Sequence, residues 1–171
     1  MRVAAVFRLM TASCTITALG CSSNGGTEPN GADCVTIQGS AQLTGNSAEL
    51  MGNGVFRFDG EDRPVEVGLY LFEMQEAPGG IFVDTQYQFH WDNGDFFLTR
   101  DWAFFEPLFE ANQYTFKTEL LFVAGTGLFA AQVGKKPLTL TAVIKFGPPP
   151  NPGDLQTAEE TFDIGGGICP G

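Results

Sequence analysis

Arg100 is the residue whose type and position most strongly indicate chemistry, because it is a cation within a segment of aromatic side chains. The Asn93-Gly94 pair that precedes it is typical of a two-residue type I′ hairpin turn. Such a turn pairs Tyr87 with Arg100 and puts both on one face of the hairpin. That face, predicted to be the interior one, comprises Tyr87, Phe89, Trp91, Phe96, Leu98, Arg100 and Trp102. A guanidinium there has to be paired or hydrated, since an isolated buried charge is very costly.

Two interpretations of Arg100 follow from this placement. In the first, which we prefer, the side chain lies near the mouth of a barrel, stacks on an aromatic ring and pairs with Glu73 or Glu106. In the second, the guanidinium anchors the carboxylate of a ligand inside an apolar cavity. The second interpretation predicts a ligand-binding set of Arg100, Tyr87, Trp102 and Trp91.

The other polar residues of this hairpin predict neither a metal site nor a catalytic group. In the predicted turn Asp92 faces Asp95, but with only Asn93 nearby the two carboxylates offer too few oxygen ligands for a calcium loop. His90 falls on the more hydrated face, with no cysteine, serine or second histidine close by in the sequence. We therefore expect no cofactor, no metal and no catalytic residue, and a structural role for His90.

The N-terminal segment 1–20 is typical of a signal peptide, with a positive start that contains Arg2 and Arg8 and a moderately apolar middle from Leu9 to Leu19. Its end, Ala18-Leu19-Gly20-Cys21, resembles the lipobox of bacterial lipoproteins, although that family prefers Leu, Val or Ile where Ala18 stands. The resemblance implies that Cys21 is acylated and becomes the new N-terminus, and that Ser22 favours the outer membrane. Residues 21–33 then form a flexible tether to a lipid anchor in the cell envelope. The alternative is an ordinary secretory signal with a cysteine near its end.

Two cysteines, Cys34 and Cys169, remain in the exported domain. In an oxidising envelope such a pair is expected to form a disulfide. The closed loop would span about 135 residues, for which the chain-entropy model gives about 4–5 kcal/mol of stabilisation. The bond would also bring the first and last strands together. A zinc site would need two more ligands, and His90 is the sole histidine of the sequence.

Composition and charge limit the function classes. A chain of 171 residues with 43% apolar residues is sufficient for one domain with a sizeable core. The formal net charge is −11, and removal of Arg2 and Arg8 with the signal peptide lowers it by two, to −13. Such an acidic protein repels phosphate backbones, so we expect no nucleic-acid partner. The sequence holds no apolar run long enough for a transmembrane helix.

Alternation of apolar and polar residues predicts strands along the whole exported domain. The clearest cases are Tyr114 to Phe122 and Leu138 to Phe146, separated by the glycine-rich corner Ala124 to Gly134. Further strands are predicted at Val35 to Leu43, Glu49 to Asp59, Val65 to Met74, Ile81 to Trp91 and Glu159 to Ile164, with another after the Asn93-Gly94 turn. About eight antiparallel strands without a long helical pattern favour an all-β closed barrel.

The segment Gly125-Thr126-Gly127-Leu128-Phe129, followed by Gly134 and an alternating strand, resembles the allene oxide cyclase and dirigent-like barrels. Gln132 departs from the family, which usually has a small residue at that position. The resemblance covers Ile81 to Phe146 and implies that residues 34–171 form an eight-stranded antiparallel barrel with an internal cavity. It also implies dimers or trimers, as among the plant members, hence a homo-oligomer. No catalytic residue of the cyclases can be carried over to this sequence.

Three functions remain open from the sequence. The leading hypothesis is a lipid-anchored envelope barrel that binds a small apolar or amphipathic molecule without catalysis. The second is an isomerase or cyclase of the allene oxide cyclase type, which would need an ordered water or a carboxylate in the cavity. The third is a structural barrel whose interior is filled by its own side chains, including the 16 phenylalanines of the chain, and whose partners are proteins.

Overall fold

The computed structural model describes residues 34–169, so the predicted signal peptide, acylated Cys21 and tether lie outside the described residues. The strands are β1 (Val35–Asn46), β2 (Glu49–Phe58), β3 (Glu61–Ala77), β4 (Gly80–His90), β5 (Phe96–Thr99), β6 (Asp101–Pro107), β7 (Gln113–Leu120), β8 (Phe122–Gly125), β9 (Leu138–Phe146) and β10 (Thr157–Ile168). A short 3₁₀ helix, η1 (Gly127–Gln132), occupies the glycine-rich corner. The predicted all-β class is therefore confirmed for this part of the chain.

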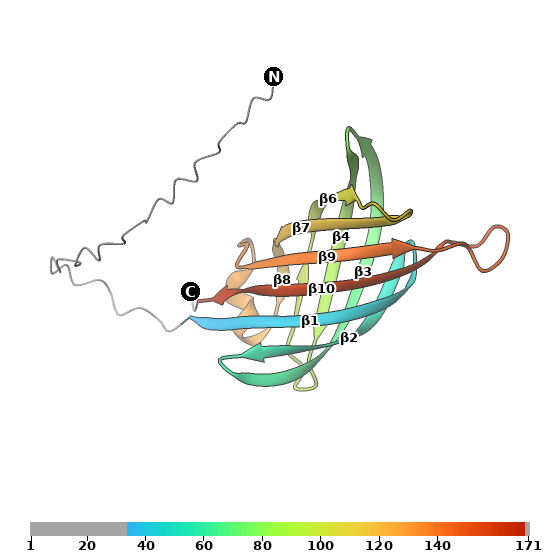
Figure 1. The fold of residues 1–171 in the computed structure, drawn as a ribbon. Coiled ribbons are helices and arrows are strands. Elements are labelled where there is room, and N and C mark those ends of the chain that lie inside the picture. Colours follow the sequence, from blue (N-terminus) through green and yellow to red (C-terminus); the bar gives the residue numbers. More distant parts are fainter. Residues whose placement is uncertain (1–33, 170–171) are drawn as a thin grey trace, which may run out of the picture. The chain divides into compact units, whose positions relative to one another are not determined.

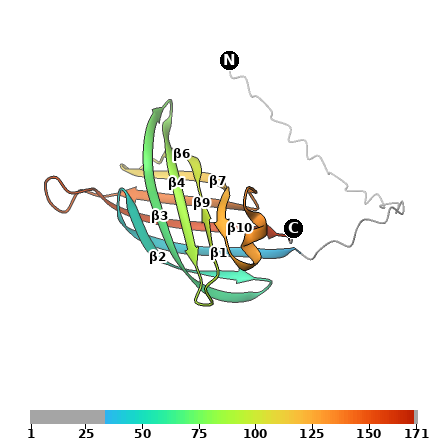
Figure 2. The ribbon, with the colours of Figure 1, turned by 180° about the vertical axis from the view of Figure 1, so that it is seen from behind.

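The strands form one antiparallel sheet that contains a ring of eight strands. The order around the ring is β3-β2-β1-β10-β9-β7-β6-β4, and β4 pairs back onto β3. Figure 1 shows β1, β9 and β10 in front, and Figure 2, from behind, shows β3 and β4. The strands β5 and β8 continue the sheet beyond β4 near one end of the ring.

One junction of the ring has a short ladder. Strands β6 and β7 pair at Glu106 with Thr115 and at Pro107 with Tyr114, whereas β7 pairs with β9 along its whole length. At the other end of this junction the Leu121 amide donates to both oxygens of the Asp101 carboxylate, at 3.0 and 2.9 Å. Where β6 begins, the Asp101 carboxylate thus takes the place of a backbone carbonyl as the acceptor for the Leu121 amide.

Alternating burial follows the pattern that the sequence predicts for the best-defined strands. In β9 the side chains of Leu138, Leu140, Ala142, Ile144 and Phe146 are buried, and their neighbours are more exposed.

The inner faces of the ring are dominated by aromatic rings in contact with one another. Phe97 lies between Phe89 and Phe122, with ring centroids 4.3 and 4.5 Å apart. Such pairs add to the hydrophobic stabilisation that burial provides.

The β4–β5 hairpin differs from the prediction by one residue. Its loop has three residues, because the Trp91 amide donates to the Asp95 carbonyl and the Gly94 amide donates back to the Trp91 carbonyl, both at 3.0 Å. Gly94 has φ +85°, the left-handed conformation that closes a three-residue loop. His90 consequently pairs with Phe96 and Phe89 with Phe97, so the predicted two-residue turn is wrong. Asp92 and Asp95 are also not opposite each other, since Asp95 pairs with Trp91.

The predicted disulfide between Cys34 and Cys169 is present and joins the residues that flank β1 and β10. These two strands also pair along their whole length, from Val35 with Ile168 to Asn46 with Thr157. The Gln132 side chain of η1 is buried and donates to the Cys169 carbonyl at 2.6 Å. The disulfide and this hydrogen bond therefore fix η1 to the strand ends at one end of the ring.

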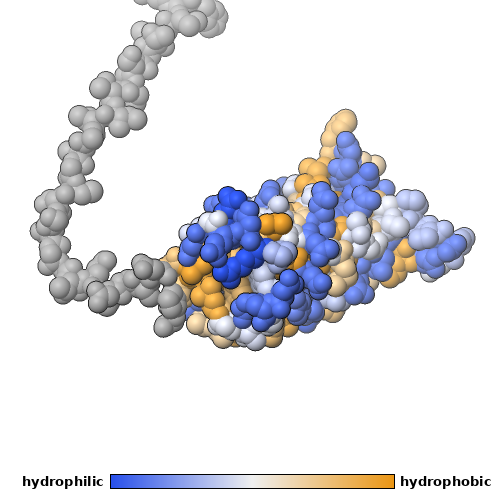
Figure 3. All heavy atoms as spheres, turned by 90° about the horizontal axis from the view of Figure 1, so that it is seen from below, coloured by the Kyte–Doolittle hydropathy of each residue, from blue (hydrophilic) through white to orange (hydrophobic). Residues whose placement is uncertain are grey.

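The outer surface of the domain carries exposed hydrophobic side chains, such as Phe72, Phe82 and Trp102, as well as hydrophilic ones. On the face seen in Figure 3, hydrophobic residues are scattered among hydrophilic ones. No helix within residues 34–169 has the length and apolar character needed to cross a membrane.

Candidate functional site

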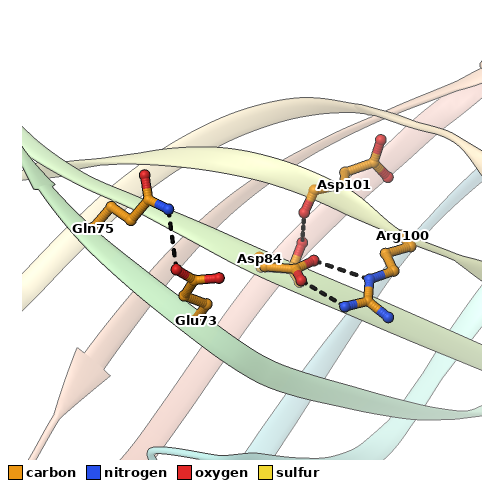
Figure 4. Close-up of polar contacts among 6 residues, drawn as sticks. Glu73, Gln75, Asp84, Arg100 and Asp101 are labelled. Atoms are coloured by element: carbon orange, nitrogen blue, oxygen red, sulfur yellow. Dashed lines mark hydrogen bonds and ion pairs between the residues drawn. The ribbon is translucent and has the colours of Figure 1, made fainter.

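Arg100 lies on the outer face of the sheet, contrary to the predicted interior placement. The hairpin register moves Phe97, Thr99 and Asp101 to the inner face, and Arg100 therefore points outward. Its guanidinium forms two hydrogen bonds to Asp84, from Nη2 at 2.6 Å and from Nε at 3.2 Å (Figure 4). The guanidinium also stacks over the Phe72 ring, with its carbon atom 4.7 Å from the ring centroid. The predicted stacked ion pair exists, but its acid is Asp84 rather than Glu73 or Glu106.

The four predicted ligand-binding residues are divided between the two faces of the sheet. Tyr87 and Trp91, both from the β4 segment, are buried inside the ring. Arg100 and Trp102 are outside, and the Trp102 side chain is 48% exposed opposite Asp84. The four side chains therefore do not line a common cavity, because the extra loop residue exchanges the faces of β5 and β6 relative to β4.

A buried acid that the sequence analysis missed contacts Tyr87. Glu160 projects inward from β10 and accepts a hydrogen bond from the Tyr87 hydroxyl at 2.6 Å. Burial is the main cause that raises the pKa of Glu160 to about 8, and the hydrogen bond from Tyr87 opposes it. Burial and the neighbouring Glu160 raise the pKa of Tyr87 well above its ordinary value. Glu160 is therefore a neutral carboxylic acid at neutral pH, and its Oε2 atom has no hydrogen-bond partner.

Asp101 is a second buried acid, close to the β6–β7 junction. Burial raises its pKa, while the Leu121 amide and Lys136, 3.9 Å away, lower it. Its backbone carbonyl accepts the Thr85 hydroxyl at 3.0 Å. Asp101 thus satisfies backbone and side-chain donors at the junction, which explains its burial in structural terms.

One pocket lies beside Trp91, a predicted site residue. It has a volume of about 260 Å³, an almost wholly apolar lining, and walls formed by Arg63, Pro64, Trp91, Asp92 and Asn93. A smaller recess of about 40 Å³ adjoins the same residues and reaches η1. Its lining comprises Phe58, Arg63, Trp91, Asn93, Asp95, Leu128 and Phe129.

Packed aromatic rings form the inner wall of this site. The Trp91 ring stacks on Phe129 of η1 at 5.0 Å between centroids and meets the edge of Phe58 at 5.6 Å. The Arg63 guanidinium lies over the Phe58 ring, with its carbon atom 5.1 Å from the ring centroid. Its Nη2 atom forms an exposed ion pair with Glu61 Oε2 at 3.3 Å. The buried aromatic rings form the inner side of the site, and the aliphatic part of the Arg63 side chain forms its outer side. Such a surface is suitable for an apolar molecule.

The turn that borders the pocket is held by its own polar groups. The Asn93 side chain donates to Asp95 Oδ2 at 2.8 Å and accepts the Asp95 amide at 3.0 Å. The Phe96 amide donates to the Thr126 hydroxyl at 3.0 Å, which connects the hairpin to the residue before η1. By contrast, the buried indole nitrogen of Trp91 has no hydrogen-bond partner. Side-chain hydrogen bonds therefore hold the turn that borders the pocket.

Within residues 34–169, no three histidine, cysteine, aspartate or glutamate side chains are grouped so that they could hold a metal ion. His90 is exposed and stacks on Phe96 at 5.7 Å between ring centroids. No protein-family model and no curated protein matches this sequence.

Proposed function

We propose that this protein is a lipid-anchored β-barrel of the cell envelope that binds a small apolar or amphipathic molecule without catalysis. The observation that carries the binding proposal is the apolar pocket of about 260 Å³ beside Trp91. Ligand pockets are typically apolar and concave with a few polar groups, and commonly measure about 300–1,000 Å³. A pocket slightly below that range fits a molecule of one or two rings.

The lipid anchor is proposed from the sequence, since Cys21 lies outside the described residues. Its support is the basic start, the apolar segment and the lipobox-like Ala18-Leu19-Gly20-Cys21. Metabolic labelling with a fatty-acid analogue should mark the wild type and spare Cys21→Ala. Equal labelling of both proteins would contradict an acylated Cys21 and would leave the pocket proposal unaffected.

Arg63 provides the test of the binding site, because its side chain lines both the pocket and the recess. Arg63→Ala removes the aliphatic part of the side chain that forms one wall of the pocket. We expect the ligand to lose contacts equivalent to one buried methylene, about 0.8 kcal/mol, which weakens binding about fourfold. The measurement is a fluorescence titration with N-phenyl-1-naphthylamine, a neutral apolar probe.

Arg57→Ala is the matched control, since Arg57 is also an exposed arginine in a surface ion pair, with Asp62 at 2.7 Å, and lies outside the pocket. It should bind the probe like the wild type. Equal weakening by both substitutions would place the site elsewhere. Absence of saturable binding by the wild type would favour the filled, protein-binding barrel.

A second candidate function, an isomerase of the cyclase type, is favoured by the Tyr87–Glu160 pair. A neutral carboxylic acid beside a tyrosine in an aromatic interior could donate or accept a proton at a bound substrate. This candidate requires the substrate to reach Glu160, which is buried, and its partner Tyr87 packs against Phe89 and Phe162. Conversion of a bound molecule during incubation, detected by mass spectrometry, would favour it over simple binding.

A further inference from the structure

The outer face of strands β3, β4 and β6 carries large aromatic side chains that are open to solvent. The exposed fraction is 55% for Phe72, 43% for Phe82 and 48% for Trp102. Phe82 also packs against Phe104 of the neighbouring strand, with 4.9 Å between the ring centroids. A single exposed apolar residue is ordinary, whereas a contiguous group of them is typical of an interaction surface.

Strand pairing makes these residues neighbours. Phe82 of β4 pairs with Phe104 of β6, and Asp84, two residues further along β4, pairs with Trp102. Arg100 extends the group to β3, because its guanidinium bonds to Asp84 and stacks on the exposed phenylalanine of that strand. The surface, which we call the aromatic face, comprises Phe72, Phe82, Trp102 and Phe104 around the ion pair of Arg100 and Asp84.

The aromatic face has the composition of the centre of a protein–protein interface. Tryptophan, phenylalanine and arginine are enriched there, and a few such residues supply most of the binding energy. A large aromatic side chain offers 150–250 Å², so covering the exposed halves of three of them removes roughly 300 Å² of apolar surface from water. That area fits the core of an interface that buries about 800 Å² on each partner.

Acidic side chains border the aromatic face. On β3, Glu73 adjoins the exposed phenylalanine and accepts a hydrogen bond from the Gln75 side chain at 3.1 Å (Figure 4). On β6, Glu106 is exposed and lies two residues beyond Phe104, hence on the same face of the strand. On β7, the neighbour of β6 in the ring, Glu119 is exposed as well.

The cations of this surface do not balance these acids. Arg100 is already paired with Asp84, at 2.6 Å. Lys117, which lines a recess together with Glu106, is the single cation in the sequences of β6 and β7. The ion pairs within residues 34–169 include none of the three bordering acids. The surface is therefore negative, which disfavours a second copy of this acidic chain and an anionic membrane as occupants.

We propose that the aromatic face docks a partner protein through a segment that combines basic and apolar side chains. The apolar side chains of the segment cover the exposed rings, and its Arg or Lys side chains pair with the bordering acids. The fold contains one example of the required contact, since Arg100 stacks on Phe72 and bonds to Asp84. The surface lies on the opposite side of the sheet from the buried Trp91, so this inference is independent of the ligand pocket.

Three octapeptides test the chemistry of the partner by isothermal titration calorimetry. One alternates arginine with leucine, one arginine with serine, and one glutamate with leucine. The full chain with Cys21→Ala is used, so that no lipid at Cys21 contributes. The arginine–leucine peptide should bind saturably, the arginine–serine peptide about tenfold or more weakly because it lacks apolar groups, and the glutamate–leucine peptide not at all.

Substitution of the rings assigns the binding to the aromatic face. Trp102→Thr and Phe82→Thr remove an exposed ring and introduce a residue that suits a strand. Each should weaken the arginine–leucine peptide by about tenfold, as expected of residues at the centre of an interface. Leu155→Thr is the matched control, since Leu155 is 53% exposed in the segment between β9 and β10, and it should change nothing. Urea unfolding establishes that the variants are folded.

Substitution of the acids tests the charge complementarity. Glu73→Gln combined with Glu106→Gln should weaken the arginine–leucine peptide by about threefold, as expected of two exposed charge contacts, and should reduce the dependence of binding on salt. Glu159→Gln combined with Asp163→Asn removes two exposed acids from β10 and is the control. Equal effects of the two double variants would reduce the attraction to the net charge of the chain and overturn the proposed site.

The other occupants are outcomes of the same experiments. Sedimentation velocity that shows a dimer lost in Trp102→Thr would assign the aromatic face to a second copy and overturn the proposal. Binding to phosphatidylcholine vesicles that Trp102→Thr abolishes would assign it to a membrane and overturn it likewise. Absence of binding of the arginine–leucine peptide up to about 1 mM, or binding that Trp102→Thr and Phe82→Thr leave unchanged, also contradicts the proposal.

Discussion

The fold opposes the ionisation of Glu160. It is 1% exposed and accepts one hydrogen bond, from the Tyr87 hydroxyl. Because burial of the charged form is costly, the pKa of Glu160 rises from 4.5 to about 8. The interior therefore holds a neutral acid whose charge state is linked to folding.

This linkage gives a pH dependence with a defined sign. Between pH 4.5 and about pH 8 the folded chain retains the Glu160 proton and the unfolded chain releases it. The free energy of unfolding then falls as the pH rises, by at most about 1.4 kcal/mol per pH unit from this group. The contribution is fully present below pH 4.5 and is lost as the pH passes through the folded pKa near 8.

Glu160→Gln removes the titrating proton, and its amide oxygen can still accept the Tyr87 hydroxyl. Relative to the wild type, the variant should gain free energy of unfolding between pH 5 and pH 9, by several kcal/mol in order of magnitude. Urea unfolding at three pH values measures this difference. Glu159→Gln, at the exposed neighbouring position, is the control and should show no such gain. A pH profile for Glu160→Gln parallel to that of the wild type would contradict a buried neutral acid.

Single positions show what the sequence could predict at the residue scale. The Cys34–Cys169 pair was predictable because an exported chain with two remaining cysteines has few alternatives. Glu160 could have been found as well, since it interrupts the inner-face series of Ala158, Phe162 and Ile164. The orphan indole nitrogen of Trp91 could not, because it depends on which groups the folded chain brings within hydrogen-bond distance.

At the element scale, the outcome depends on one loop residue. Asn-Gly is compatible with a two-residue turn and with a three-residue loop that has glycine in the left-handed conformation. The Asn93-Gly94 pair favoured the first, because both central residues of a type I′ turn need positive φ. The observed register instead buries Phe97, Thr99 and Asp101. Tertiary contacts explain the difference, since Asp101 accepts the Leu121 amide and Thr85 donates to the Asp101 carbonyl. A shift of one residue then exchanges every face, and Arg100 moves outside.

The strands themselves were predicted well where alternation was long and uninterrupted. In β9 the buried positions match the predicted inner face. The glycine-rich corner was also predicted correctly as a break in regular strand structure, and it contains η1. The interruptions of the neighbouring strands, at Arg100 and Leu121, were not predictable because they arise from a contact between the two segments.

At the scale of the whole molecule, one end of the ring combines covalent closure with the proposed ligand site. The Cys34–Cys169 disulfide flanks β1 and β10, and Gln132 connects η1 to Cys169. The same η1 places Phe129 against Trp91. The chain-entropy model gives such a long disulfide loop about 4–5 kcal/mol of stabilisation. The aromatic wall of the pocket thus lies next to the part of the fold that the disulfide closes.

The most direct test of the central claim uses the two tryptophans, which lie on opposite sides of the sheet. Trp102→Phe leaves Trp91 as the sole fluorophore of this type, and Trp91→Phe leaves the exposed Trp102. The ligand is 4-bromoacetophenone, a neutral ring ketone whose bromine quenches indole emission on contact. The account predicts saturable quenching of Trp91 in the first protein and only linear, collisional quenching of Trp102 in the second. Linear quenching of Trp91, or saturable quenching confined to Trp102, would contradict a ligand site at Trp91.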